Sequence, residues 1–303
     1  MFVPSSVELT IEQRIAEASC LLPGWGGVTG WASLHWQGAT SWFDGRYADS
    51  TDRPVWLAVG GDDIRPQPGV AISAERLDPR DLVTVDGIAL TSAVRSTCFE
   101  MRYAKDARRA AVVLSMVAYY DLVSIDELAE YAARHSGWTG IPQCRAGIGL
   151  AEENCWSPAE VDMVLVWKVD AELPPPLCNQ PLFDLVGNHI GTPDLVDVEA
   201  GVIGQYDGGL HLAGAQRAID ERAEERYRDF GLECFTMVAA DRSNPGRMAE
   251  RMHAARKRAL WEAESHRRWT AVPPPWWTPT TTVELRRALD ADQQARFLRY
   301  RAA

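Results

Sequence analysis

The stretch GTPDLVDVEAGVIGQYDGGLH, residues 191–211, places an aspartate at each end of a predicted β-hairpin. Asp194 opens the first strand, and Asp207 closes the return strand just before two glycines. Gln205 stands two residues before Asp207, and His211 follows the glycines. Each aspartate alone is typical of a turn, and a lone histidine most often lies at a surface. Their combination in one hairpin raises the question of whether they hold a cation.

The sequence around the hairpin predicts an α/β region. Its hydrophobic periodicity predicts, in order, a helix at 157–171, a strand at 181–185, the hairpin at 193–206, a helix at 213–230, a strand at 232–238 and a helix at 246–266. Strands and helices in this order favour a mixed sheet flanked by helices. After the segment VPPPWW (272–277), a last amphipathic helix is expected at about 282–300.

The first half of the chain predicts a smaller, mainly helical domain with short strands. Helices are expected at 10–22, 28–38, 92–103, 105–120 and 124–135, and strands at 55–59, 82–87 and 88–91. A loop rich in glycine and proline, 136–156, marks the boundary. We therefore expect a recognition domain at 1–140, a second domain at 150–268, and a Pro/Trp linker with a C-terminal helix at 269–303.

Composition limits the classes of function. The chain has 303 residues and a net charge of −11, which argues against a protein that coats nucleic acid through many phosphate contacts. Contact with DNA is then expected only through a local basic patch. The six cysteines form no CxxC pair, so a zinc site is not expected. The longest apolar stretch, 110–120, is too short to span a membrane, and the N-terminus lacks a secretory signal. We therefore expect a cytoplasmic protein without a membrane partner.

Glu160 lies near the start of the helix expected at 157–171. Ser157 can cap this helix, and Glu160 follows three residues later, which is the spacing of a capping box. Glu160 also shares one helix stripe with Met163, Val164 and Trp167. A carboxylate beside an apolar stripe is costly unless it is paired or bound to a cation. The two roles, helix cap and functional group, both stay open and can coexist.

A helix carboxylate and two aspartates at the ends of a hairpin can converge on one point. Glu160, Asp194 and Asp207 would then bind Mg²⁺, a hard cation that takes oxygen ligands and keeps several waters. A divalent cation polarises a phosphate oxygen and generates a nucleophile from water. The cluster therefore favours metal-dependent chemistry on a phosphodiester.

Several short stretches carry a resemblance to a known family. They are VTGWASLHWQG, VDGIALTSAVRS, CFEMRYA, SPAEV, LPPPLCNQPLFDLVG, GTPDLVD, YDGGLH and RYRDFGLE. With these motifs the chain resembles PD-(D/E)XK proteins of the restriction-endonuclease-like fold, in the very-short-patch-repair-like branch. More narrowly, it resembles actinobacterial AbiEi-like proteins of toxin–antitoxin and abortive-infection systems. The resemblance implies a nuclease-like mixed sheet flanked by helices at 150–268.

The same resemblance implies a role for each candidate site residue. Asp194 would be the central metal-binding aspartate, Glu160 the helix carboxylate that completes the site, and His211 a proton donor or a supporting group. Gln205 occupies the place of a metal-binding glutamate, and Asp207 the place of a lysine. The implied cofactor is Mg²⁺ or Mn²⁺, and the implied partner is DNA. Two acidic residues of the following helix would lie behind the site: Asp220 and Glu224.

Departures from the family pattern keep two functions open. Gln205 carries no charge and binds a hard cation more weakly than a carboxylate does. Arginines, the usual bidentate readers of phosphate, are replaced at three positions: Asp162, Val164 and Ala223. The first hypothesis is a DNA endonuclease, catalytically weakened, in phage defence. The second is a non-catalytic DNA-binding regulator or antitoxin that keeps the fold and binds a toxin partner. A structural or protein-binding role unrelated to DNA is a third.

Basic residues on the helix expected at 246–266 are the candidate contacts to DNA phosphates: Arg251, Arg256, Lys257 and Arg258. Such a run is also typical of a solvated helix face, and both interpretations stay open. A second basic strip is expected at 91–109: Arg95, Arg102, Lys105, Arg108 and Arg109. Trp276 and Trp277 can stack on bases or pin the C-terminal segment onto its domain.

Overall fold

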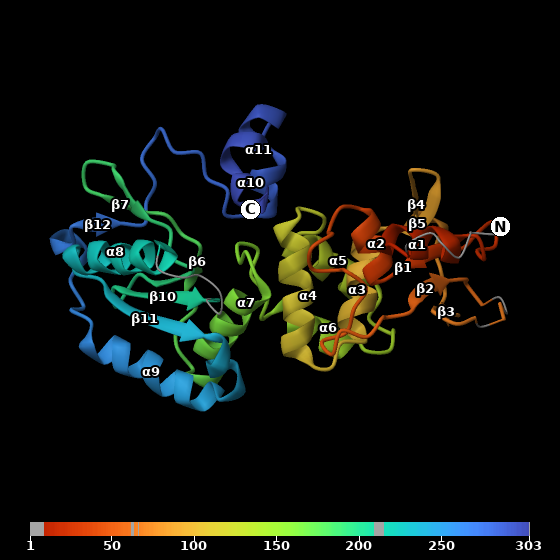
Figure 1. The fold of residues 1–303 in the computed structure, drawn as a ribbon, viewed down its shortest axis with the longest axis horizontal. Coiled ribbons are helices and arrows are strands. Elements are labelled where there is room, and N and C mark those ends of the chain that lie inside the picture. Colours follow the sequence, from red (N-terminus) through yellow and green to blue (C-terminus); the bar gives the residue numbers. More distant parts are fainter. Residues whose placement is uncertain (1–8, 62–63, 66, 209–214, 303) are drawn as a thin grey trace. The chain divides into compact units, whose positions relative to one another are not determined.

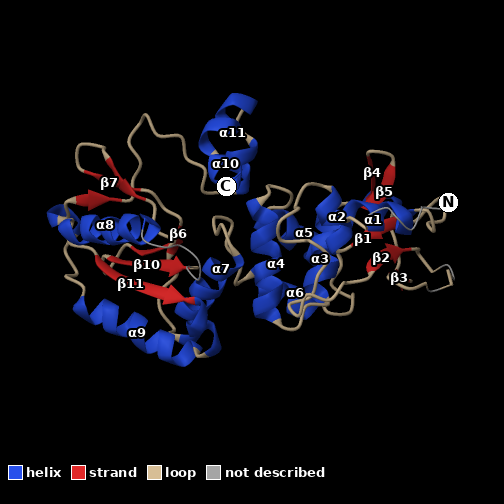
Figure 2. Ribbon diagram, viewed as in Figure 1, coloured by secondary structure: helices blue, strands red, loops and turns tan. Residues whose placement is uncertain are grey.

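The computed structural model describes residues 9–61, 64–65, 67–208 and 215–302, with the side chains of 215–221 and 302 left out. The chain divides into two compact units, residues 1–149 and 150–303. Both units combine helices with sheets, so the predicted α/β class with mixed sheets is confirmed at that level (Figures 1 and 2). No helix in the described ranges is long and apolar enough to cross a membrane.

The first unit is built on a five-stranded sheet with the order β3-β2-β1-β5-β4. Its strands are β1 (Gly27–Thr29), β2 (Val55–Ala58), β3 (Val70–Ser73), β4 (Leu82–Val85) and β5 (Ile88–Thr91). β1 pairs with β5, and β2 with β3, in parallel, whereas β1–β2 and β4–β5 are antiparallel. Asp86 and Gly87 join β4 to β5, both at positive φ, as a tight hairpin turn requires.

The helices of this unit begin where the sequence provides capping side chains. They are α1 (Ile11–Ser19), α2 (Trp31–Trp36), α3 (Ala93–Arg102), α4 (Ala107–Tyr119), α5 (Ile125–Arg134) and α6 (Ile141–Ile148). Thr10 caps α1, and Ser124 caps α5. Glu127 accepts from the backbone N–H of Ser124 at 2.7 Å, so the predicted capping box is confirmed. α6 was not expected. It lies in the loop predicted at 136–156.

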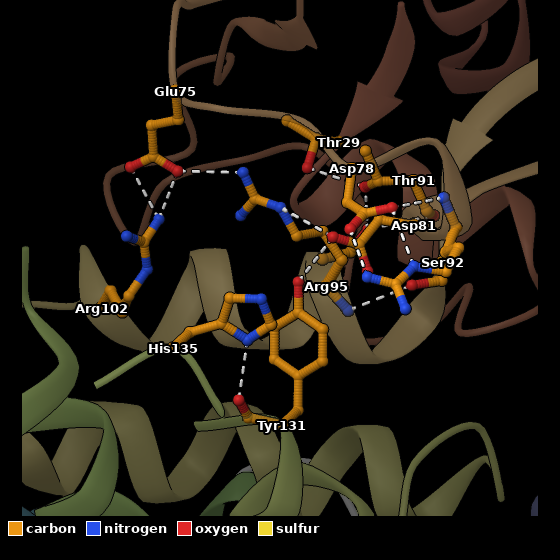
Figure 3. Close-up of polar contacts among 12 residues, drawn as sticks. Thr29, Glu75, Asp78, Asp81, Thr91, Ser92, Arg95, Arg102, Tyr131 and His135 are labelled. Atoms are coloured by element: carbon orange, nitrogen blue, oxygen red, sulfur yellow. Dashed lines mark hydrogen bonds and ion pairs between the residues drawn. The ribbon is translucent and has the colours of Figure 1, made fainter. Parts of the chain in front are cut away.

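Two buried arginines of α3 share one carboxylate (Figure 3). Arg95 and Arg102 are 0% and 5% exposed, and both donate to Glu75, Arg95 at 3.0 Å and Arg102 at 2.5 and 2.7 Å. The ring of Trp138 lies 4.5 Å from one guanidinium carbon and 4.9 Å from the other. The prediction of a basic surface strip at 91–109 is therefore wrong for Arg95 and Arg102, because an internal ion pair holds both side chains in the core.

The second unit contains two sheets. One has four strands in the order β11-β10-β9-β6, and the other has three in the order β12-β7-β8. The strands are β6 (Leu177–Cys178), β7 (Leu182–Asp184), β8 (His189–Gly191), β9 (Leu195–Asp197), β10 (Val202–Asp207), β11 (Glu233–Val238) and β12 (Trp269–Thr270). β10 and β11 are parallel, and the other pairs are antiparallel. The strand expected at 181–185 thus belongs to a different sheet from the hairpin.

Helices cover both sides of the four-stranded sheet. They are α7 (Pro158–Leu165), α8 (Ala215–Asp229) and α9 (Pro245–Arg258). Two further helices follow toward the C-terminus, α10 (Val283–Arg287) and α11 (Ala291–Phe297). A π-helical turn, Val166–Asp170, continues α7. Figure 1 shows α8 and α9 on opposite sides of β10 and β11.

In the second unit, the last two expected helices differ from their predicted ranges. The helix expected at 246–266 ends at Arg258, because the backbone becomes extended at Ala259. The helix expected at 282–300 is two helices. Asp290 starts the second by accepting from the Gln293 backbone N–H at 2.8 Å, and the Gln293 side chain accepts from the Asp290 backbone N–H at 3.0 Å. A strong internal capping box thus interrupts an otherwise continuous amphipathic pattern.

The hairpin of β9 and β10 forms the middle of its sheet. Val196 and Ile203 are paired across it and pack with Tyr227 of α8. The opposite face carries Gly204, which the ring of Phe235 covers closely. Since strand side chains alternate, this packing fixes the register of the hairpin and, with it, the direction of the polar side chains at its end.

Candidate metal centre

Glu160 occupies the first turn of α7, and its carboxylate turns back over the helix start. Ser157 Oγ accepts from the Glu160 backbone N–H at 3.2 Å and donates to Glu160 Oε1 at 2.9 Å. Glu160 Oε2 accepts from the backbone N–H of Trp156 at 2.7 Å. The predicted capping by Ser157 is confirmed, but Glu160 reaches the backbone of Trp156 rather than that of Ser157. The apolar residues on its stripe are buried: Met163, Val164 and Trp167.

Asp194 stands immediately before β9. The paired residues of the hairpin end with Leu195 and Gly204, so Asp194 lies one step further, across from Gln205. The backbone N–H of Tyr206 donates to Asp194 Oδ2 at 2.6 Å. This hydrogen bond joins the two strands at the end of the hairpin through one oxygen of Asp194.

Asn179 is a third polar residue of the site, and the sequence analysis did not single it out. It follows β6, and its backbone N–H donates to the carbonyl of Asp194 at 3.2 Å. Its side-chain Nδ2 donates to Glu160 Oε2 at 2.7 Å and to the carbonyl of Asn154 at 2.7 Å. Its φ is +43°, in the left-handed region that asparagine tolerates better than most residues. One asparagine thus connects the helix carboxylate with the start of the hairpin.

The buried carboxyl group of Glu160 and the partly buried one of Asp194 form a pair of like charges. Burial, and then the negative charge of Glu160, raise the pKa of Asp194 to about 7, against the hydrogen bond from Tyr206. Burial also raises the pKa of Glu160, against the hydrogen bonds that its oxygens accept. In the described part of the chain, no arginine or lysine forms an ion pair with either group or lowers its pKa. Such a pair is stabilised by an added positive charge.

The other predicted site residues lie further out. Gln205 is half-buried, and Asp207 is exposed at the end of β10. Because residues two apart in a strand share a face, both point to the face of the sheet on which Asp194 lies. His211 lies outside the described residues, and so does the side chain of Asp220.

The structure does not gather three acidic groups around one point. Within the described ranges, no group of three or more His, Cys, Asp or Glu side chains is placed to hold a metal ion. Glu160 and Asp194 interact, but Asp207 does not complete a three-carboxylate cluster with them. The expected convergence of all three is therefore not found, because Asp207 lies on the exposed end of its strand.

Arg256 of α9 is part of the fold rather than a free surface cation. Its Nε donates to Asp197 at 2.6 Å, and its side chain is 16% exposed. A second carboxylate, that of Glu199, lies 3.4 Å from Nη2. The guanidinium also lies 4.7 Å from the ring centre of Trp261. This residue ties α9 to the end of β9.

The remaining basic residues of α9 are more accessible. Lys257 is exposed. Arg251 and Arg258 keep exposed surface and each pair with one acidic side chain, at 2.9 Å and 2.6 Å respectively: Asp241 and Glu233. Both also line a cavity of about 320 Å³ beside β11, together with Arg228 and Glu224. Glu224 is engaged there, since Arg228 donates to it at 2.6 Å.

The C-terminal segment is fastened to the second unit by aromatic contacts. Trp277 meets Phe183 edge-on at 4.9 Å between ring centres and stacks on His189 at 5.2 Å. Tyr300 stacks on Trp156 at 4.0 Å. Trp277 thus pins this segment, as one of the two interpretations predicted, whereas Trp276 is largely exposed.

Comparisons of the chain with protein-family models, with curated proteins and with solved structures find no match. The restriction-endonuclease-like resemblance therefore stays a prediction from the sequence motifs.

Proposed function

We propose that this chain is a divalent-metal-dependent, endonuclease-like DNA-binding protein of the cytoplasm, with a restriction-endonuclease-like second unit. The observation that carries the proposal is the interaction of Glu160 with Asp194. A buried and a partly buried carboxyl group from distant parts of the chain act on each other without a basic partner in the described residues. Two like charges in such a place are unfavourable unless one group takes up a proton or a cation joins them. The context of phage defence or toxin–antitoxin systems comes from the motif resemblance.

The donor set fits Mg²⁺ or Mn²⁺. Within the described residues, Asp194 accepts a hydrogen bond with Oδ2 alone, and Glu160 brings a second carboxylate. Gln205 adds a neutral amide oxygen on the same face of the sheet as Asp194. Mg²⁺ is usually held by one or two protein carboxylates and completes its shell with water. A cation bound here would polarise a phosphate oxygen and lower the pKa of a water molecule. In this proposal Asp207, exposed at the strand end, faces the incoming substrate.

A second candidate function is a non-catalytic DNA-binding regulator or antitoxin with a toxin partner. Gln205 favours it, because its amide supplies no negative charge where the family pattern has a glutamate. The lack of a three-carboxylate cluster among the described residues points the same way. Such a protein would keep the nuclease-like fold and the basic residues of α9 without cleaving DNA.

Nicking of a supercoiled plasmid distinguishes the two functions. The wild type, Asp194→Ala and Gln205→Glu are compared with Mg²⁺, with Mn²⁺ and with EDTA. We expect slow, metal-dependent nicking by the wild type, none by Asp194→Ala, and faster nicking by Gln205→Glu, which restores a carboxylate. If no variant nicks the plasmid but the wild type still shifts it in a gel, the regulator is the better account. Absence of both DNA and metal binding overturns both functions.

A further inference from the structure

We propose that Asn179 belongs to the cation site: its amide nitrogen holds Glu160 beside Asp194, and its amide oxygen is a ligand of the divalent cation. This inference rests on the proposed function and adds a residue to the site. Asn179 lies in the stretch LPPPLCNQPLFDLVG, but the resemblance assigns it no role.

The amide oxygen of Asn179 is buried without a hydrogen-bond partner among the described residues. The side-chain nitrogen is fully used, since it donates to Glu160 Oε2 and to the carbonyl of Asn154, both at 2.7 Å. These two acceptors fix the orientation of the amide, so that Oδ1 is the atom left over. In the described part of the chain, no donor bonds to Oδ1, although the residue is only 2% exposed. Buried polar atoms nearly always have a partner, and an orphaned oxygen therefore marks a place for a positive group.

The sheet register places this residue beside the carboxylates. β6 and β9 are paired up to Cys178 and Leu195, and the bond from the Asn179 N–H to the Asp194 carbonyl continues the ladder by one step. On the other side of Asp194, the register of β9 with β10 brings Gln205 to the same level. Asn179, Asp194 and Gln205 thus stand in one row across three neighbouring strands, with Glu160 bonded to the first of them.

The charges of this set suit a divalent cation. Glu160 and Asp194 supply two negative charges, which balance the charge of Mg²⁺ or Mn²⁺. Asn179 and Gln205 supply neutral oxygens, which add ligands without adding repulsion. Oxygen-only sets with waters in the remaining positions are what these cations prefer. The proposal therefore also explains how a site with two carboxylates can bind a cation without a third.

Calorimetric titration of the full chain with Mn²⁺ tests the role of Asn179 independently of cleavage. Asn179→Gly removes both amide atoms, and Asn179→Asp keeps an oxygen at Oδ1 but removes the N–H groups. Glycine and aspartate both tolerate the positive φ of this position, so neither variant strains the backbone. We expect Asn179→Gly to bind Mn²⁺ at least tenfold more weakly than the wild type. Asn179→Asp should bind it as tightly or more tightly, with a larger rise in Tm on adding Mn²⁺.

A purely structural role gives a different pattern. Asn179→Asp places a third negative charge beside Glu160 in the metal-free fold, so a structural role predicts that it weakens Mn²⁺ binding as much as Asn179→Gly does. Asn154→Ala is the matched control, because it removes buried amide hydrogen bonds to the carbonyls of Cys178 and Asn179 without touching either carboxylate. We expect it to retain Mn²⁺ affinity, and an equal loss in this variant overturns the inference.

If the wild type binds no Mn²⁺, the proposed function fails as well. If the wild type binds Mn²⁺ and Asn179→Gly binds it equally well, only the role of Asn179 fails.

Discussion

The carboxylate of Glu160 acts on that of Asp194, and together with burial it raises the pKa of Asp194 to about 7 from an ordinary value of 3.8. Between these two pH values, folded Asp194 holds a proton that the unfolded chain has released. The stability that this proton confers is fully present below about pH 4 and is lost as the pH rises through about 7. The metal-free protein should therefore lose stability across this window.

Asp194→Asn removes the titrating group and keeps an oxygen for the Tyr206 N–H. At pH 8 only the wild type carries a negative charge at this position, so we expect the variant to melt at a higher temperature than the wild type. At pH 4.5 the side chain is neutral in both folded proteins, and we expect nearly the same melting temperature. Thermal melts in EDTA at the two pH values measure the difference. A difference in Tm that does not change with pH contradicts the raised pKa.

Glu160 serves both the helix start and the site, and two substitutions separate these roles. Glu160→Ala leaves the N–H of Trp156 and one N–H of the Asn179 amide without an acceptor, which should cost about 1–3 kcal/mol of stability. Glu160→Gln can keep these bonds through its amide oxygen and can donate to Ser157 Oγ, so it should stay close to the wild type in stability. Both variants should lose Mn²⁺ affinity. Urea unfolding and Mn²⁺ titration measure the two effects, and full Mn²⁺ binding by Glu160→Gln would exclude this carboxylate from the site.

Local signals made part of this site predictable. The cap at Ser157 predicts where α7 begins and hence where Glu160 stands, and the alternation in 193–206 predicts the β9–β10 hairpin. Both features depend on neighbours within a few residues. The end of α9 was misjudged because its basic and apolar pattern continues past Arg258, although the backbone does not.

Other parts depend on contacts that the sequence does not display. Asn179 becomes part of the site through a positive φ and bonds to residues 19 and 25 positions away. In the sequence it lies within the stretch LPPPLCNQPLFDLVG, directly after a short apolar segment, and neither feature gives it a role. Arg256 looks like a free cation in the sequence, yet its partner Asp197 lies 59 positions away. The prediction for Arg95 and Arg102 was wrong for the same reason, because Glu75 lies 20 and 27 positions away in the loop after β3.

Glu75 is expected to be essential for the stability of the first unit. Glu75→Ala leaves the buried guanidinium groups of Arg95 and Arg102 without their shared acceptor (Figure 3). Breaking a buried ion pair on one side should destabilise the protein by about 3 kcal/mol or more. Glu130→Ala is the control, because Glu130 pairs only with an exposed arginine of the same helix among the contacts described, Arg134, and should cost little. Urea unfolding compares the two variants, and similar losses would show that the buried network contributes no more than a surface pair.

Gly204 is expected to tolerate no side chain. A Cβ at this position would collide with the ring of Phe235, and the clash should destabilise the second unit by about 1–3 kcal/mol. At Gly208, near the end of the same segment, the nearest atom to an added Cβ is in Tyr206 at 3.8 Å, an ordinary contact. Calorimetric melting of Gly204→Ala and Gly208→Ala should therefore show a lowered Tm for the first variant only. Equal melting temperatures would mean that Phe235 can move aside.

Arg256 and Lys257 are neighbours in α9 but should respond differently to substitution. Arg256→Ala leaves the carboxylate of Asp197, which is only 5% exposed, without its ion-pair partner, and should cost about 3 kcal/mol of stability. Lys257→Ala removes an exposed charge and should change stability by less than about 0.5 kcal/mol.

If α9 lies along DNA, Lys257→Ala should weaken binding to all DNA sequences equally and reduce the salt dependence of binding. Urea unfolding and gel shifts at two salt concentrations measure both effects. Unchanged DNA affinity of Lys257→Ala would place the DNA contact elsewhere, and unchanged stability of Arg256→Ala would mean that its ion pair does not hold α9 to the end of β9.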